Sequence, residues 1–191
     1  EVMVSHTFYT QHTEEFYDFY KNKMIFLDAK PNKAHLKLAE MEQAGKLSAI
    51  VTQNIDGLHQ AAGSKNVFEL HGSVHRNYCQ KCGKFFDVNY VVNAKGVPYC
   101  DECGGIIKPD VVLYEEGLDS QTINGAVRAI SKADMLIIGG TSLVVYPAAG
   151  MIDYFKGKYL AVLNRDATSR DKQADLCITD PIGEVLGRIR V

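Results

Sequence analysis

Short apolar runs alternate with helically spaced apolar residues along most of the chain. The continuous runs predict strands, at residues 46–52, 111–114, 135–138, 159–163 and 176–179. The helical spacing predicts helices, at residues 11–26, 33–44, 120–131, 147–155 and from 182 onward. Because the strands are apolar throughout and helices separate them, we expect an α/β fold with a doubly wound parallel sheet covered on both faces.

Local signals mark the ends of one helix and a change of texture further along the chain. Asn32 can cap the start of the helix at 33–44, and Gly45 follows its end, where glycine is common. Between residues 77 and 105 the strand–helix rhythm stops, and cysteines, glycines and polar residues take over. We expect this segment to be an insertion that does not form a core by itself.

The composition is that of an ordinary globular protein. The 191 residues are 46% hydrophobic and 23% charged with a formal net charge of −2, which permits one main domain and a small inserted module. A duplex-DNA binder would carry a basic excess. The longest uncharged stretch, 135–152, contains Gly139, Gly140 and Pro147, which predict a strand, a turn and a helix start rather than a membrane span. Since no signal peptide is visible either, we expect a cytoplasmic protein without nucleic-acid or membrane partners.

Four cysteines form two Cys-x-x-Cys pairs, Cys79 with Cys82 and Cys100 with Cys103. Seventeen residues separate the pairs, and a glycine after each lets the backbone turn tightly around an ion. This spacing predicts one structural Zn²⁺ held by four thiolates. Two disulfides or a redox pair are the alternatives, although nothing in the sequence indicates secretion. Cys177, in a late apolar strand, is expected to be buried, with a reactive thiol as the alternative.

Polar residues follow several predicted strands, at the end where ligands bind in open α/β sheets. The segment 52–59 carries amide and carboxylate side chains that suit a carboxamide or a sugar, and a turn-capping cluster explains it equally well. His71 follows another apolar segment, and a lone histidine is more often structural than catalytic. Residues 139–142 and 163–166 place glycines, hydroxyls and an amide after two further strands. Three such clusters together indicate a nucleotide site along one edge of the sheet.

Taken in order, these motifs resemble the sirtuins, the NAD-dependent protein lysine deacylases, over essentially the whole chain. The matching segments are TQNIDGLH at 52–59, ELHG at 69–72, the two cysteine pairs, KPDVVLYEE at 108–116, GTSLVVYPA at 140–148 and LNRD at 163–166. The resemblance, to bacterial-type members, implies three parts. These are a small helical module including 1–31, a Rossmann-like NAD-binding domain of 32–76 and 106–191, and a four-cysteine zinc-ribbon module at 77–105.

The resemblance also implies an activity and its residues. Acetyl groups would pass from acetyl-lysine in proteins or peptides to ADP-ribose, with release of nicotinamide. His71 would be the general base for a ribose hydroxyl, which suits an imidazole because its unperturbed pKa is ~6.5. NAD contacts are implied for Gln53, Asn54, Ile55, Asp56, Gly140, Thr141, Ser142, Asn164, Arg165 and Ile182. Contacts with the acyl-lysine substrate are implied for Val111, Tyr114, Glu116, Gly117, Leu143, Val144 and Val145.

The sequence departs from the family pattern in two places. Tyr114-Glu115-Glu116 stands where the family usually has Phe-Gly-Glu, among residues expected to hold the peptide. The family also begins with a strand and a Gly-Ala-Gly loop that cradles the pyrophosphate, whereas residues 1–8 match the segment just after that loop. We therefore expect the first βα unit and half of the cofactor site to be absent from the sequence as written.

Other classes of function stay open at this stage. A truncated, zinc-stapled scaffold of the same family would lack catalysis, and an NAD-dependent protein ADP-ribosyltransferase would use the same cofactor. A zinc-ribbon nucleic-acid binder is disfavoured by the net charge and by the strand-end clusters. The deacetylase is the leading hypothesis because it uses all the motifs at once.

Overall fold

Strands in the second half of the chain form a three-stranded parallel sheet. The computed structural model describes residues 1–191, and these strands pair in the order β6 (Met135–Gly139), β7 (Tyr159–Leu163) and β8 (Leu176–Ile178). Their continuous apolar runs predicted both the strands and their parallel pairing, and the structure confirms both. A second parallel pair, β1 (Ile50–Thr52) with β2 (Val67–Glu69), completes the α/β character.

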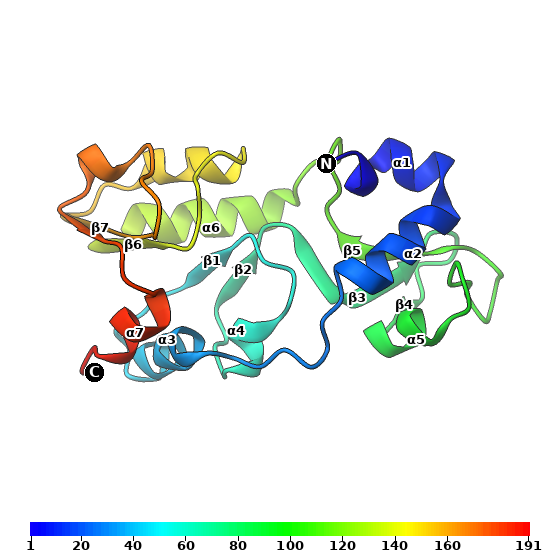
Figure 1. The fold of residues 1–191 in the computed structure, drawn as a ribbon, viewed down its shortest axis with the longest axis horizontal. Coiled ribbons are helices and arrows are strands. Elements are labelled where there is room, and N and C mark those ends of the chain that lie inside the picture. The colour runs from blue at the N-terminus through cyan, green and yellow to red at the C-terminus, as the bar shows by residue number, and fades with distance from the viewer. The chain divides into compact units, whose positions relative to one another are not determined.

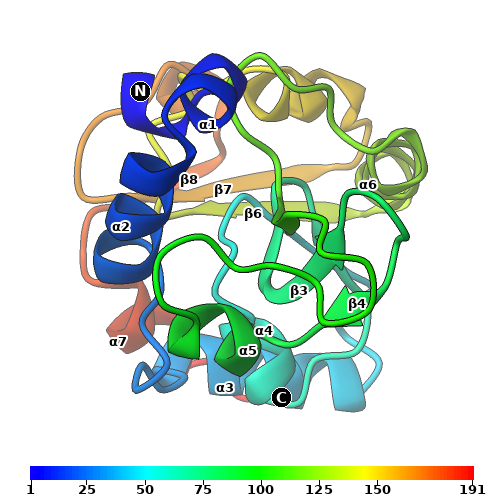
Figure 2. The ribbon, with the colours of Figure 1, turned by 90° about the vertical axis from the view of Figure 1, so that its right-hand side faces the viewer.

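Helices cover both faces of the β6-β7-β8 sheet (Figure 1, Figure 2). On one face lie α3 (Lys33–Gln43) and α7 (Ile182–Gly187), and on the other the 3₁₀ helix η2 (Ala148–Tyr154) with α6 (Ser120–Lys132) beside it. Leu160 and Val162 of β7 pack on the η2 face. The alternate residues Ala161 and Leu163 pack on the α3 face. The period of two along a strand thus supplies both apolar faces.

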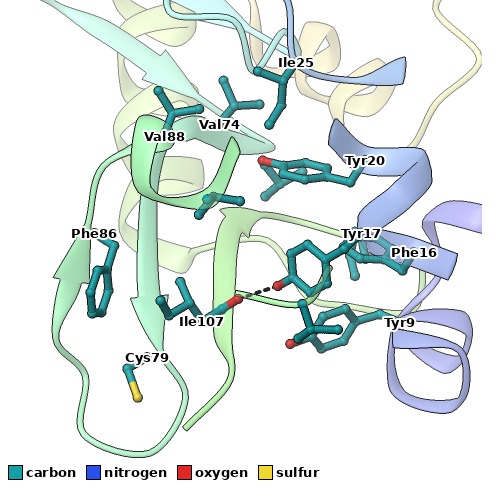
Figure 3. Close-up of a cluster of buried hydrophobic side chains, with 14 of the residues drawn as sticks. Tyr9, Phe16, Tyr17, Tyr20, Ile25, Val74, Cys79, Phe86, Val88 and Ile107 are labelled. Atoms are coloured by element: carbon teal, nitrogen blue, oxygen red, sulfur yellow. Dashed lines mark hydrogen bonds between the residues drawn. The ribbon is translucent and has the colours of Figure 1, made fainter. Parts of the chain in front are cut away.

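An antiparallel sheet and three helices form a separate core that includes the cysteine-rich segment. The strand order is β4 (Phe85–Phe86), β3 (Gly72–Cys79) and β5 (Ile107–Val111). The helices are α1 (His6–Gln11), α2 (Thr13–Lys23) and α5 (Val88–Asn93). Figure 3 shows Tyr17 of α2 pointing at Ile107, whose carbonyl accepts the hydroxyl of Tyr17, and Phe16 and Tyr20 of the same helix belong to the same buried cluster. The cysteine-rich insertion therefore shares its core with residues near the start of the chain.

These elements divide into two compact units. Unit 1 comprises residues 1–29, 53–57 and 71–118, and unit 2 comprises residues 30–52, 58–70 and 119–191. The short helix α4 (Leu58–Ala61) belongs to unit 2, the 3₁₀ helix η1 (Val2–Val4) to unit 1, and η3 (Asp171–Gln173) to unit 2. The division into two compact units does not test the roles expected for residues 1–31, for 32–76 with 106–191, and for 77–105. These three functional parts therefore stay a prediction.

Some predicted helices and strands have different ends in the structure. The helix expected at 11–26 is α2, which is shorter at both ends, and it begins only at Thr13 because the backbone of His12 leaves the helical region after α1. The strand expected at 46–52 begins only at residue 50, since the N–H groups of Lys46 and Leu47 donate to Met41 at the end of α3. Asn32 caps α3 as predicted, and its side chain accepts from Ala34 and His35.

Two predictions about strands were wrong. The strand expected at 111–114 lies at 107–111 and is antiparallel, because Ile107 pairs with Cys79 and buries its side chain in the unit 1 core. Pro109 argued against a strand at 107–111 in the sequence, because proline cannot donate a hydrogen bond to a neighbouring strand. It is tolerated there because β5 is an edge strand. Cys177 is exposed rather than buried, because β8 is also an edge strand, and its thiol donates to the carbonyl of Asp171 at 3.6 Å.

None of the helices is both long and apolar enough to cross a lipid bilayer.

Candidate functional site

The four cysteines of the two Cys-x-x-Cys pairs meet at one point in unit 1. All four Sγ atoms lie within 4.8 Å of one another, and the cysteines are free. Cys79 and Cys103 approach to 3.3 Å and Cys82 and Cys100 to 3.6 Å, far beyond a covalent sulfur–sulfur bond. Tetrahedral Zn²⁺ with bonds of about 2.3 Å needs sulfurs about 3.8 Å apart. The donor set and its spacing therefore fit zinc, as predicted, and not two disulfides.

The two cysteine pairs have the same backbone geometry. In the first, the N–H of Cys79 donates to Lys84, and in the second the N–H of Cys100 donates to Gly105, five residues ahead in both. Amides of Lys81 and Cys82 also point at the sulfur of Cys79, at 3.4 and 3.5 Å. Desolvation raises the pKa of the Cys79 thiol, but these amides and the neighbouring thiols outweigh it and lower the pKa to about 6. The thiolate, which is the form that binds zinc, is thereby favoured at Cys79. At Cys82 the amide of Lys84 lowers the pKa, but desolvation and the hydrogen bonds with the other thiols outweigh it and raise the pKa to about 12.

Gly105 is a residue that the sequence reading missed at this cluster. A Cβ added there would lie 2.8 Å from the sulfur of Cys79 and 2.8 Å from Cβ of Lys81. Glycine therefore allows the chain to pass directly over the metal site. Two glycines, Gly104 and Gly105, follow Cys103 in the sequence, and the second of them is the signal that could have identified this position.

His71 is held against the 53–56 segment, for which NAD contacts are expected. Its Nδ1 lies 3.0 Å from the carbonyl oxygen of Gln53. Ile55 accepts from the N–H of Val74 at 3.0 Å, and the carbonyl of Asp56 lies 3.0 Å from Nε2 of His75. Three successive contacts thus join residues 53–56 to the His71–His75 segment. The structure brings together Gln53, Asn54, Ile55, Asp56 and His71, and His75 is a support that the sequence did not reveal.

The hydrogen bond of His71 determines the tautomer of its ring. A carbonyl oxygen only accepts, so Nδ1 is the nitrogen that carries hydrogen. In the neutral ring the free lone pair then lies on Nε2. A half-buried imidazole with a fixed tautomer has the geometry of a general base acting through Nε2.

In unit 2, the strand ends bring the remaining polar residues to one edge of the sheet. The N–H of Gly140 donates to Leu163, and the N–H of Asn164 donates to Ile178, so the ends of β6, β7 and β8 lie side by side. Gly140, Thr141, Ser142, Asn164 and Arg165 follow these ends, with Ser142 and Arg165 exposed. Ile182 also reaches this edge, because a Cβ on Gly139 would clash with its Cδ1.

Residues expected to contact the acyl-lysine have contrasting surroundings. In unit 1, Val111 is buried in the core, whereas Tyr114 is 45% exposed and Gly117 is exposed. In unit 2, Leu143 is 8% exposed and packs on the η2 face of the sheet, whereas Val144 is 70% exposed and Val145 is also exposed. The exposed members can meet a ligand directly, and the buried ones can only shape its surroundings.

Glu116 joins the 113–116 turn to α1 and β5. Its carboxylate contacts Nδ1 of His6 at 2.8 Å and Nζ of Lys108 at 3.1 Å, and it accepts the N–H of Leu113 at 2.9 Å. Partial burial raises the pKa of this carboxyl, but the N–H of Leu113, His6 and Lys108 outweigh burial and hold the pKa below its usual range. Hydrogen bonds from Thr7 likewise hold the pKa of Glu115 below its usual range.

The fold and these residues define a class of protein. The chain combines a parallel α/β sheet that has polar strand ends with four cysteines arranged for a structural zinc. This combination is typical of a nucleotide-binding protein of the Rossmann-like type that carries a structural zinc. The sequence profile of the Sir2 family matches residues 1–147. The chain belongs to the Sir2 family.

Relatives and solved structures agree with this family. An NAD-dependent protein deacetylase of Clostridium acetobutylicum is 66% identical over 187 residues, covering 97% of this chain and 76% of the relative. One from Cutibacterium acnes is 51% identical over 190 residues, covering 100% of this chain and 78% of the relative. A structure described as Sir2 with a p53 peptide and NAD+ is 40% identical with a TM-score of 0.90, covering 97% of this chain and 80% of that one.

Proposed function

We propose that this protein is an NAD-dependent protein lysine deacetylase. It transfers the acetyl group of an acetylated lysine to the ADP-ribose part of NAD and releases nicotinamide. The observation that carries the proposal is the ring of His71, whose tautomer makes Nε2 a base beside the 53–56 segment. The relatives named as deacetylases and the structures of Sir2 with peptide and NAD+ support it.

The residues present fit NAD at two places. In unit 2, Gly140 has a φ of +62° and nothing within 4 Å of where a Cβ would lie, so its backbone is open to a phosphate or ribose. Thr141, Ser142, Asn164, Arg165 and Ile182 would bind the adenosine side of the dinucleotide. In unit 1, Gln53, Asn54, Ile55 and Asp56 would bind the nicotinamide side. When bound, NAD supplies an anomeric carbon that accepts the acyl oxygen as nicotinamide leaves.

The chain's own residues would take up one proton and bind one peptide. Nε2 of His71 would take the proton from a ribose hydroxyl, while Nδ1–H stays on the carbonyl of Gln53 and keeps the ring in place. Glu116 and Gly117 of unit 1, and Leu143, Val144 and Val145 of unit 2, would bind the acetylated peptide as an added strand, and Val111 and Tyr114 would contact the acyl-lysine. Cys79, Cys82, Cys100 and Cys103 would hold zinc with four thiolates, which would leave it no open position for a substrate and give it a structural role.

Nicotinamide release from NAD and an acetyl-lysine peptide tests the proposal, with the full-length gene product as enzyme. His71→Ala should lower kcat by about 10²–10⁴-fold because the base is gone. His71→Gln is the matched variant, since its amide N–H can still donate to the carbonyl of Gln53 but cannot take the proton. Both variants should lose activity while keeping zinc content and thermal stability.

Three outcomes would contradict the proposal. Activity that survives in His71→Gln would show that His71 only positions the 53–56 segment. Transfer of ADP-ribose to a protein, with no acetyl transfer, would favour the ADP-ribosyltransferase. Peptide binding without any nicotinamide release from the wild-type protein would favour the scaffold.

We also propose that the protein works in the cytoplasm. Support comes from its five free cysteines, four of which are arranged for zinc, because thiols persist in a reducing compartment.

A further inference from the structure

Glu115 has a strained backbone and a side chain held in one place. Its φ is +76°, in the left-handed region that favours glycine, and the sirtuin pattern has glycine at this position. One oxygen, Oε2, accepts both the N–H of Thr7 at 2.9 Å and the hydroxyl of Thr7 at 2.7 Å. These two bonds fix the carboxylate beside Tyr114, one of the residues expected to meet the substrate.

The neighbouring carboxylate of Glu116 is fully engaged, whereas that of Glu115 is not. Both oxygens of Glu116 have partners, and Lys108 balances its charge. The partners of Glu115 come only from Thr7 and are neutral. No lysine, arginine or histidine forms an ion pair with it, its Oε1 makes no hydrogen bond within the protein, and the residue is exposed. Glu115 therefore presents a fixed carboxylate with one free oxygen and no ion-pair partner, although His6 lies close enough to interact with its charge.

The surroundings of this charge suit a long basic side chain. Tyr114 and Glu115 line a hollow of about 440 Å³ in unit 1, whose other walls come from residues 1–12, including Phe8 of α1 and His12 just after α1. Nδ1 of His12 lies 3.1 Å from the carboxylate of Glu15, so the imidazole is already engaged by another acid. Aromatic rings can pack against the aliphatic stem of a lysine or arginine, and a free carboxylate oxygen can accept its cationic end.

We propose that Glu115 is a specificity-determining residue that selects substrates with a lysine or arginine beside the acetylated lysine. The inference rests on the proposed function, because Tyr114, Glu116 and Gly117 are the residues expected to run alongside the peptide. A glycine at position 115 would offer neither the charge nor the fixed oxygen. The departure from the family pattern thus becomes a preference for basic sequence context.

Peptides that differ in one flanking residue test this preference. Acetyl-lysine peptides carrying lysine, glutamine or glutamate on either side are compared by kcat/KM for nicotinamide release. The wild-type protein should favour lysine over glutamine by about two- to five-fold, the range of an exposed ion pair, mainly through KM. The preference should shrink in about 1 M NaCl, where charges are screened within about 3 Å.

Two variants separate charge from geometry. Glu115→Gln removes the charge but keeps an oxygen that accepts from Thr7, so the turn is preserved and the preference for lysine should disappear. Thr7→Val keeps the charge but removes the hydroxyl that helps to fix it, so the preference should weaken. Glu14→Gln removes an equal charge from the exposed side of α2 and should leave the preference intact.

The inference fails if the wild-type protein turns over all peptides equally, or if Glu115→Gln still prefers lysine. Glu115 would then serve only to hold α1 to the turn. Failure of the proposed function is a different result, since no peptide would then release nicotinamide.

Discussion

The backbone at Gly72 carries a constraint on which the position of His71 depends. Gly72 has a φ of +75°, and a Cβ there would clash with the carbonyl oxygen of Asp110 in β5. The N–H of Val112 donates to the carbonyl of His71 at 3.0 Å, so the chain at residues 110–112 contacts both His71 and Gly72. A side chain at position 72 would push β3 and β5 apart at the point where His71 is anchored.

Gly72→Ala should therefore lower both stability and activity. We expect a loss of about 2 kcal/mol or more in the free energy of unfolding, measured by urea denaturation. We also expect kcat to fall by about 10- to 100-fold, as for a misplaced catalytic group. Gly96→Ala is the control, because Gly96 has a φ of +69° and open space around it. It should cost only about 1 kcal/mol and leave kcat unchanged; equal effects of the two substitutions would disprove the clash.

At the scale of elements, a set of polar contacts holds the short helix α1 to the turn after β5. The N–H of His6 donates to Tyr114, and the N–H of Tyr114 donates to Val4, which makes a backbone bridge between distant segments. Glu116 adds contacts with His6 and Lys108. Since α1 has only six residues, it is too short to be stable alone and depends on this attachment.

This attachment should weaken in acid. The pKa of Glu116 is lower in the folded protein than in the unfolded chain, where it is about 4.3. Its stabilising effect is thus complete above about pH 4.3 and is lost as the pH falls through the lower, folded value. Glu116→Gln should be less stable than wild type at pH 7, and the difference should shrink below about pH 4, as urea denaturation at a series of pH values can show.

Glu14→Gln controls for the loss of one negative charge from the same unit. Its stability relative to wild type should stay nearly constant over the same range of pH. A difference between wild type and Glu116→Gln that grows in acid would contradict the predicted sign.

At the scale of the whole molecule, the zinc cluster supports more of the chain than its own segment. Cys79 belongs to the same buried cluster as Tyr9, Phe16 and Tyr17 (Figure 3), and so does Cys100. Residues 77–105 supply Phe86, Val88, Val91 and Val97 to this cluster, and α1 and α2 supply Tyr9, Phe16, Tyr17 and Tyr20, so the segment shares its core with the helices. Loss of the metal should therefore disturb unit 1 as a whole.

Zinc removal tests this dependence. We expect about one zinc per chain, and a strong chelator should abolish the near-ultraviolet signal of the buried tyrosines. Hydrogen exchange should then rise first in β3 and β5, before β6 and β7 of unit 2. Cys100→Ser should act like the chelator, whereas Cys177→Ser, an exposed cysteine outside the cluster, should keep both zinc and fold. A fully folded, metal-free protein would contradict the prediction.

Much of the fold could be predicted because its signals are local. The strand at 159–163 and the capped helix at 33–43 follow from apolar period and end residues within the segments themselves. β5 could not be placed in this way, because its pairing with β3 and the burial of Ile107 involve residues about thirty positions away. A sequence pattern does not show which partner a short strand will find.

The same division holds for the site. The four zinc ligands could be named from the amino-acid sequence, because a short fixed spacing within each pair is enough to bring two thiolates to one ion. The tautomer of His71 and the bonds between Glu115 and Thr7 became visible only in the folded molecule. Those contacts join residues 18 and 108 positions apart, so they exist only once the core has brought distant segments together. Hydrogen bonds act over about 3 Å, and that proximity is a property of the packed molecule rather than of any segment.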